Sequence, residues 1–146
     1  MRILLLSPYD TRSHRRWREG LVAAFPGHDW TVLTLPPRHF IWRVRGNSLS
    51  WALGERERLL QPYDLVVATS MTDLSALKGM VPPLAAVPAM VYFHENQFAY
   101  PDRREQQRNE PAVVSLYAAL AAVRVVFNSE YNRQTFLQGV DALLRR

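Results

Sequence analysis

Four consecutive polar residues follow a short apolar run at residues 90–93, and they have the clearest chemical capacity in the chain. His94 comes first, and a histidine can hold a hydroxyl or phosphate oxygen and can change its charge near neutral pH. Glu95 could orient the imidazole, and the amides of Asn96 and Gln97 suit the edges of a sugar or a base. The alternative is a strand-end histidine bonded to backbone, which position alone slightly favours.

A basic segment offers a second kind of chemistry. Trp42, Arg43 and Arg45 alternate an aromatic ring with arginines, a pattern that can stack on a base and grip a phosphate. Asn47 continues the same segment and is a further candidate substrate-binding residue. An extended loop with Trp42 in the core and both arginines in water explains the pattern equally well.

Two further pairs of polar residues lie at expected helix starts. Ser13 and His14 open the first helix, whose backbone amides favour an anion, although an ordinary N-cap explains Ser13 better. Asn128 and Ser129 follow the last apolar run, and an N-cap also explains Ser129 well. We count all four among the candidate substrate-binding residues.

These candidates are positioned by five short apolar runs, at residues 3–6, 30–35, 65–68, 90–93 and 123–127. Such runs indicate strands buried on both faces, as in a parallel sheet. Helical patterns lie between them, at residues 17–25, 49–60, 72–78 and 112–122, with a last helix from residue 130 that Gly139 could interrupt. The least regular stretches are 36–48 and 95–111. The alternation predicts an α/β fold: a Rossmann-like, doubly wound parallel sheet of about five strands with helices on both faces.

The carboxyl ends of the strands in such a sheet lie along one edge, where ligands bind. The polar candidates all follow apolar runs, so we expect them at that edge. The ordinary polarity of loops explains the segments that start at His94 and Trp42 poorly.

Several common chemistries lack their signatures. The first turn has neither G-x-G-x-x-G nor a P-loop, and no G-x-S-x-G occurs anywhere. There is no cysteine, and the four histidines lack zinc-ligand spacing. A transferase without a bound cofactor or a binding module remains.

The chain has 146 residues, is 48% hydrophobic and has a formal net charge of +5, with Lys78 as its one lysine. Arginines gather at positions 12–18 and again at Arg38, Arg43 and Arg45. Such clusters suit an anionic partner, although arginine-rich codon usage explains the composition equally well. No apolar stretch has the length of a membrane helix or the features of a signal peptide. We therefore expect one domain over residues 1–146 and a cytoplasmic location.

Several segments together resemble the tRNA-queuosine α-mannosyltransferases. They are Leu35-Pro36-Pro37 with Trp42-Arg43-x-Arg45, Tyr92-Phe93-His94-Glu95-Asn96-Gln97 with Tyr100-Pro101, Val125-Val126-Phe127-Asn128-Ser129 with Asn132 and Phe136, and Ser13-His14. The resemblance covers nearly the whole chain, and the segment around His94 is its most specific part.

This resemblance implies a retaining GT-B enzyme with two Rossmann-like domains facing a cleft. Its donor would be GDP-mannose, and its acceptor queuosine at the wobble position of tRNA-Asp. His94 would lie beside the transferred sugar. Residues 1–146 would form the N-terminal, acceptor-side domain, and the C-terminal, donor-binding domain would lie outside this chain. No cofactor or metal is expected, and the isolated chain would be inactive.

The first turn departs from the pattern of related sugar transferases. It contains Asp10-Thr11-Arg12 where many relatives have glycines that let the backbone approach the donor phosphates. Two other functions stay open: a basic, Rossmann-like RNA-binding module without catalysis, and the acceptor domain of a glycosyltransferase that acts on a lipid or a small sugar.

Overall fold

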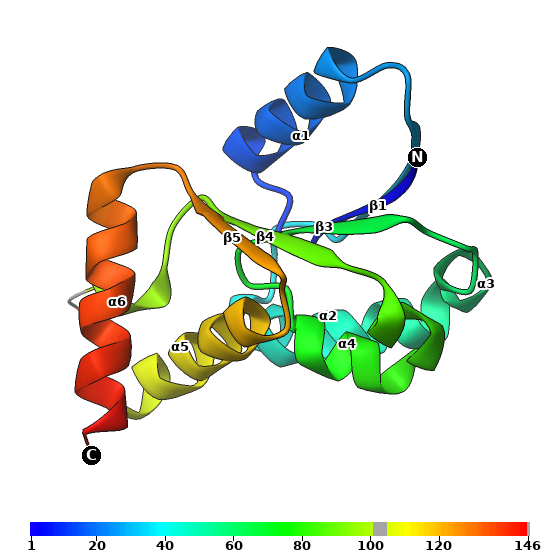
Figure 1. The fold of residues 1–146 in the computed structure, drawn as a ribbon. Coiled ribbons are helices and arrows are strands. Elements are labelled where there is room, and N and C mark those ends of the chain that lie inside the picture. Colours follow the sequence, from blue (N-terminus) through cyan, green and yellow to red (C-terminus); the bar gives the residue numbers. More distant parts are fainter. Residues whose placement is uncertain (101–104, 146) are drawn as a thin grey trace.

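A five-stranded parallel sheet organises the chain in the computed structural model, which describes residues 1–100 and 105–145 and only the backbone of residues 105–109 (Figure 1). The strands are β1 (Arg2–Ser7), β2 (Asp29–Thr34), β3 (Leu65–Thr69), β4 (Ala89–Phe93) and β5 (Arg124–Phe127). Their order is β2-β1-β3-β4-β5, and every neighbouring pair is parallel. The predicted Rossmann-like α/β fold is confirmed.

The position of β1 inside the sheet explains why its sequence is a continuous apolar run. Leu4, Leu5 and Leu6 of β1 have no exposed surface, since β2 and β3 flank the strand and helices cover both of its faces. The chain goes from β1 to β2 on one side and then returns to β3 on the other. The carboxyl ends of β1 and β3 therefore form the switch point of the sheet, where open α/β folds bind ligands.

The helices divide unequally between the two faces of the sheet (Figure 1). α1 (Arg12–Ala24) covers one face, where Ile3, Leu5 and Val67 form a small core with its apolar residues. The other face carries α2 (Phe40–Gly54), α3 (Arg56–Leu59), α4 (Leu74–Met80) and α5 (Glu105–Leu120). α6 (Glu130–Leu144) lies at the end of the sheet and packs with the large core through Phe136 and Val140. Two short 3-10 helices, η1 (Pro82–Ala86) and η2 (Gln97–Ala99), flank β4.

The prediction of an irregular stretch at residues 36–48 was wrong, because α2 already begins at Phe40. The buried side of α2 includes Arg43, Asn47 and Ser48 beside its apolar residues. Polar residues on the buried face remove the apolar periodicity by which a helix is recognised in a sequence. The single helix expected at residues 49–60 also divides at Glu55 into α2 and α3.

Several helix ends can be compared with their predictions. Ser129 is the N-cap of α6, as predicted, and its hydroxyl accepts a hydrogen bond of 3.2 Å from the backbone amide of Asn132. Ser13 is not an N-cap, since Thr11 occupies that position in α1. α6 continues through Gly139, and α5 includes Pro111 in its interior, whereas the prediction placed its start after this proline.

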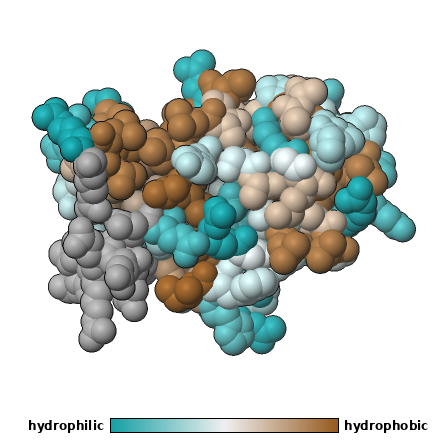
Figure 2. Space-filling model, turned by 90° about the horizontal axis from the view of Figure 1, so that it is seen from below, coloured by the Kyte–Doolittle hydropathy of each residue, from teal (hydrophilic) through white to brown (hydrophobic). Residues whose placement is uncertain are grey.

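The surface on the side of α2, α4 and α5 is mixed. Seen from below, hydrophobic residues are interrupted by hydrophilic ones and gather most at the end of the molecule where α5 and α6 lie (Figure 2). Leu120, Val123, Leu137 and Leu144 are among the exposed large hydrophobic residues. In the described part of the chain, none of the helices has the length and apolar character needed to cross a membrane.

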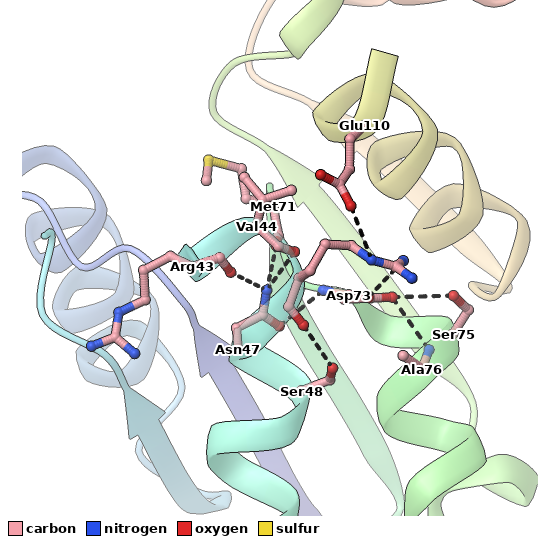
Figure 3. A network of polar contacts seen from close by, with 10 residues as sticks. Arg43, Val44, Asn47, Ser48, Met71, Asp73, Ser75, Ala76 and Glu110 are labelled. Atoms are coloured by element: carbon pink, nitrogen blue, oxygen red, sulfur yellow. Dashed lines mark hydrogen bonds and ion pairs between the residues drawn. The ribbon is translucent and has the colours of Figure 1, made fainter. Parts of the chain in front are cut away.

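A buried amide ties α2 to the segment that follows β3 (Figure 3). The Nδ2 of Asn47 donates to the carbonyls of Arg43 at 2.6 Å, Val44 at 3.0 Å and Met71 at 3.0 Å. Its Oδ1 accepts from the backbone amide of Asp73 at 3.0 Å. Met71 has a φ of 70°, a left-handed conformation that is costly outside glycine, and the Asn47 amide fixes it.

We therefore expect Asn47→Ala to lower the free energy of unfolding by about 2–4 kcal/mol, because it leaves the buried groups of Met71 and Asp73 without partners. Urea denaturation measures this loss. The matched control is Ser50→Ala, whose hydroxyl bonds only within its own helix, to the Gly46 carbonyl, and it should cost less than about 1 kcal/mol. Equal losses in the two variants would show that Asn47 does not fix the loop.

Candidate functional site

His94 lies beside α1, one residue beyond the end of β4. Side chains alternate along a strand, so Tyr92 and His94 project from the face that α1 covers. The His94 ring stacks on the ring of His14, with centroids 4.1 Å apart and planes at 16°. One turn further along α1, Trp17 stacks on Tyr92 with centroids 4.3 Å apart. Two ring pairs thus join the helix to the strand.

Glu95 connects three parts of the chain at the carboxyl edge of the sheet. One carboxylate oxygen, Oε2, lies 3.3 Å from His14 Nε2. The other, Oε1, accepts a hydrogen bond of 3.4 Å from the hydroxyl of Ser70, directly after β3. Both oxygens of Glu95 therefore have partners within the protein.

The surroundings of this cluster lower the pKa values of both His94 and Glu95. Burial is the main cause that lowers the pKa of His94 from 6.5 to about 4; His14 lowers it further, and Glu95 opposes the shift. For Glu95, burial raises the pKa, but the hydrogen bond from His14, the charges of both histidines and the hydrogen bond from Ser70 together lower it. At neutral pH a neutral His94 ring thus lies beside an ionised Glu95.

Two ring atoms of the histidine pair are buried without a hydrogen-bond partner, His14 Nδ1 and His94 Nε2. His94 also lines a cavity of about 250 Å³ beyond the ends of β4 and β5. The cavity wall consists of His94, Glu95, Asn96, Ala99, Tyr100, Asn128, Ser129, Tyr131 and Asn132. A neutral imidazole and several amides and hydroxyls are groups that bind the hydroxyls of a small polar ligand.

The amides near this cavity are largely occupied by the protein itself. Asn96 is buried, and its Nδ2 donates to the carbonyl and Oδ1 of Asn132 and to the hydroxyl of Thr135. Gln97 is buried in η2. Asn128 is exposed and donates to the carbonyl of His94 at 2.6 Å, so it fixes the backbone of the candidate catalytic residue.

The basic segment lies on α2, and its members differ in environment. Trp42 is 54% exposed and lies against Gly46, where any larger residue would meet the indole. Arg45 is half-exposed and pairs with Asp73 at 3.1 Å and Glu110 at 3.5 Å. Arg43, in contrast, is only 9% exposed, and Asn47 is fully buried in the network described above.

The arginines at the start of α1 also differ from one another. The buried carboxylate of Asp10 accepts two hydrogen bonds of 2.9 Å from Arg18 and one of 3.4 Å from Arg15. Arg12 and Arg16 are exposed. Together with Asp10, Arg15, Glu19 and Pro37 they line an open hollow of about 570 Å³. Ser13 is exposed nearby and shares a hydrogen bond of 3.1 Å with the Thr11 hydroxyl.

The structure thus brings His14, His94 and Glu95 together and adds residues that the sequence did not single out. Ser70 bonds to Glu95, and the rings of Trp17 and Tyr92, stacked on each other, both contact His94 edge-on. Ser70 follows a strand in the same way as the other candidates, so position was the available signal. The described residues contain no group of three or more histidine, aspartate or glutamate side chains arranged to hold a metal ion.

The lowered pKa of His94 predicts how stability depends on pH. The folded pKa near 4 lies below the ordinary 6.5, so the unfolded chain takes up the proton first. Acidification from pH 6.5 to 4 should therefore remove about 1–3 kcal/mol of unfolding free energy, after allowance for solvent screening. The pKa of Glu95 is lowered from 4.5, so this carboxylate adds its own loss of unfolding free energy as the pH falls below 4.5. Urea denaturation across this range measures the slope.

His94→Asn should flatten that slope, while the exposed, matched variant His39→Asn should keep it. If both variants lose stability on acidification as the parent does, His94 is not the group that titrates.

Comparison with known proteins identifies the family of the chain. Residues 2–146 match the family described as "tRNA-queuosine alpha-mannosyltransferase N-terminal". A relative from Drosophila melanogaster, described as "tRNA-queuosine alpha-mannosyltransferase", is 34% identical over 144 residues. That match covers 97% of this chain and 37% of the relative, so the chain spans little more than a third of the relative's length. The chain belongs to the tRNA-queuosine alpha-mannosyltransferase family and corresponds to its N-terminal domain.

Proposed function

We propose that this chain is the acceptor-side domain of a two-domain, retaining GT-B enzyme that transfers mannose from GDP-mannose to queuosine in tRNA-Asp. The observation that carries the proposal is the neutral His94 ring, which lines a polar cavity at the carboxyl edge of the sheet in a chain of this family. Donor binding would fall to a second domain outside residues 1–146, and the setting would be the cytoplasm.

The electrostatics of the cluster suit sugar transfer. In a retaining transfer, positive charge develops on the sugar and negative charge on the departing phosphate. A neutral imidazole can hydrogen-bond a sugar hydroxyl without placing a second positive charge beside it. Glu95 has both oxygens occupied by His14 and Ser70, so we assign it to orienting the histidine pair.

The surface around the start of α1 supports a polyanionic acceptor. Arg12 and Arg16 are exposed, and the carboxylate of Asp10 in the same hollow is already occupied by Arg15 and Arg18. Arg12 and Arg16 have no carboxylate partner among the described residues, and two such cations at the ligand-binding edge of the sheet suit the phosphates of RNA.

If Arg12 and Arg16 contact RNA phosphates, the double variant Arg12→Gln/Arg16→Gln should weaken tRNA binding. The slope of log affinity against log salt should become flatter by about 1–2. Fluorescence anisotropy with queuosine-containing tRNA measures this slope at several salt concentrations.

The matched control is Arg56→Gln/Arg124→Gln, which removes the same charge at the opposite edge, from the exposed starts of α3 and β5. Equal changes in both double variants would mean that net charge alone attracts the RNA.

In the full-length enzyme, His94→Asn should lower turnover by about 10²–10³, the usual cost of losing one donor aimed at the transition state. Affinity for tRNA and stability at neutral pH should stay near those of the parent. Mass spectrometry of queuosine-containing tRNA after incubation with GDP-mannose measures the transfer. His39→Asn is again the control. Unchanged turnover in His94→Asn would remove His94 from the reaction, and tRNA binding without any transfer by the parent would favour an RNA-binding module instead.

A further inference from the structure

Arg43 is a largely buried cation that none of the described residues neutralises. Only 9% of the residue is exposed, and its guanidinium Nε is buried without a hydrogen-bond partner. Its backbone is fixed on both sides, since its amide donates to the His39 carbonyl at 2.9 Å and its carbonyl accepts from Asn47 at 2.6 Å. The side chain therefore starts from a rigid point.

The nearby acids belong to other arginines. Asp73 and Glu110 pair with Arg45, and the side chain of Arg43 extends away from both of them (Figure 3). Asp10 is occupied by Arg15 and Arg18. Arg43 makes no hydrogen bond or ion pair through its side chain with the residues that the structure describes. Buried charges in proteins normally have a partner, so an arginine that lacks one is a position prepared for an anion.

The fold places this arginine at the switch point of the sheet. α2 follows the carboxyl end of β2, so the first turns of the helix lie above the carboxyl edge. Val44, the next residue, packs in one apolar cluster with Met71, which follows β3, and with Tyr9, which follows β1. Arg43 is thus anchored where β1 and β3 end, the usual ligand position in an open α/β sheet.

We propose that Arg43 binds a phosphate group at the β1–β3 switch point. This phosphate site is separate from the exposed arginines of α1. A planar guanidinium on a fixed backbone can donate two parallel hydrogen bonds to phosphate oxygens, which a lysine cannot reproduce. The choice of phosphate among anions rests on the proposed function, because both of its substrates contain phosphate. The phosphate comes either from a nucleoside diphosphate or from RNA.

The test follows the Nε–H resonance of Arg43 by ¹⁵N NMR in the 146-residue chain, assigned by its absence in Arg43→Lys. Three probes are titrated separately: inorganic phosphate, GDP and a tRNA-Asp anticodon stem-loop. We expect a saturable shift of this resonance with phosphate. A stronger response to GDP identifies a nucleotide as the source, and a stronger response to the stem-loop identifies RNA.

Arg43→Met keeps the unbranched stem of the side chain and removes the charged guanidinium group. We expect its phosphate affinity to fall at least about tenfold while its melting temperature without ligand stays equal or rises, because an unpaired buried charge is lost. Arg56→Met, at the exposed start of α3 on the opposite edge of the sheet, is the control and should keep the phosphate response. Arg43→Lys, which retains the charge, should bind more weakly than the parent and covers the case in which Arg43→Met does not fold.

The proposal is overturned if none of the three probes shifts the Arg43 resonance, or if Arg43→Met or Arg43→Lys binds phosphate as the parent does. Failure of the proposed function has a different signature. In that case the Arg43 resonance still responds to phosphate, while the full-length enzyme transfers no mannose to queuosine-containing tRNA.

Discussion

The site depends on the packing of α1 against β4 through two pairs of stacked rings. Residues three apart on a helix lie about 4.5 Å apart along its axis, and alternate residues of a strand about 6.6 Å apart, so His14 and Trp17 can meet His94 and Tyr92 in one register. This register brings the start of α1, with its arginines, to the same edge as the histidine pair. A shift of α1 by one turn would separate the groups that Glu95 joins.

This packing also determines where charge is placed. His14 is buried and His94 is partly buried, and this burial keeps His94 neutral, while Glu95 stays ionised through its contacts with His14 and Ser70. The positive charges of Arg12 and Arg16 lie outside, in water. They line a separate hollow, where they can attract a polyanion, whereas the cavity at His94 is lined by no arginine or lysine among the described residues.

The strands could be predicted from the sequence because parallel strands buried on both faces, such as β1, must be continuously apolar. Because the strands are parallel, the residues that follow them must lie at one edge of the sheet. His94, Glu95 and Asn128 do lie there, directly after β4 and β5. α2 was missed because its buried face includes Arg43 and Asn47. The stacking of His14 on His94 joins residues 80 positions apart and depends on how α1 crosses the sheet, which no local pattern encodes.

The polar residues on the buried face of α2 also show how a structural residue differs from a ligand-binding one. Asn47 and Arg43 are neighbours on one helix face, and both are buried. Every polar atom of the Asn47 side chain has a partner inside the protein, so the residue is explained by the loop that it fixes. Among the described residues the guanidinium of Arg43 has no such partner, and its Nε is buried, so the fold gains no stability from this cation. Burial alone therefore does not identify a structural residue. What distinguishes the two cases is whether the polar atoms of the buried side chain have hydrogen-bond partners in the protein. If they have, the fold explains the residue; if they have not, a ligand is needed to explain it.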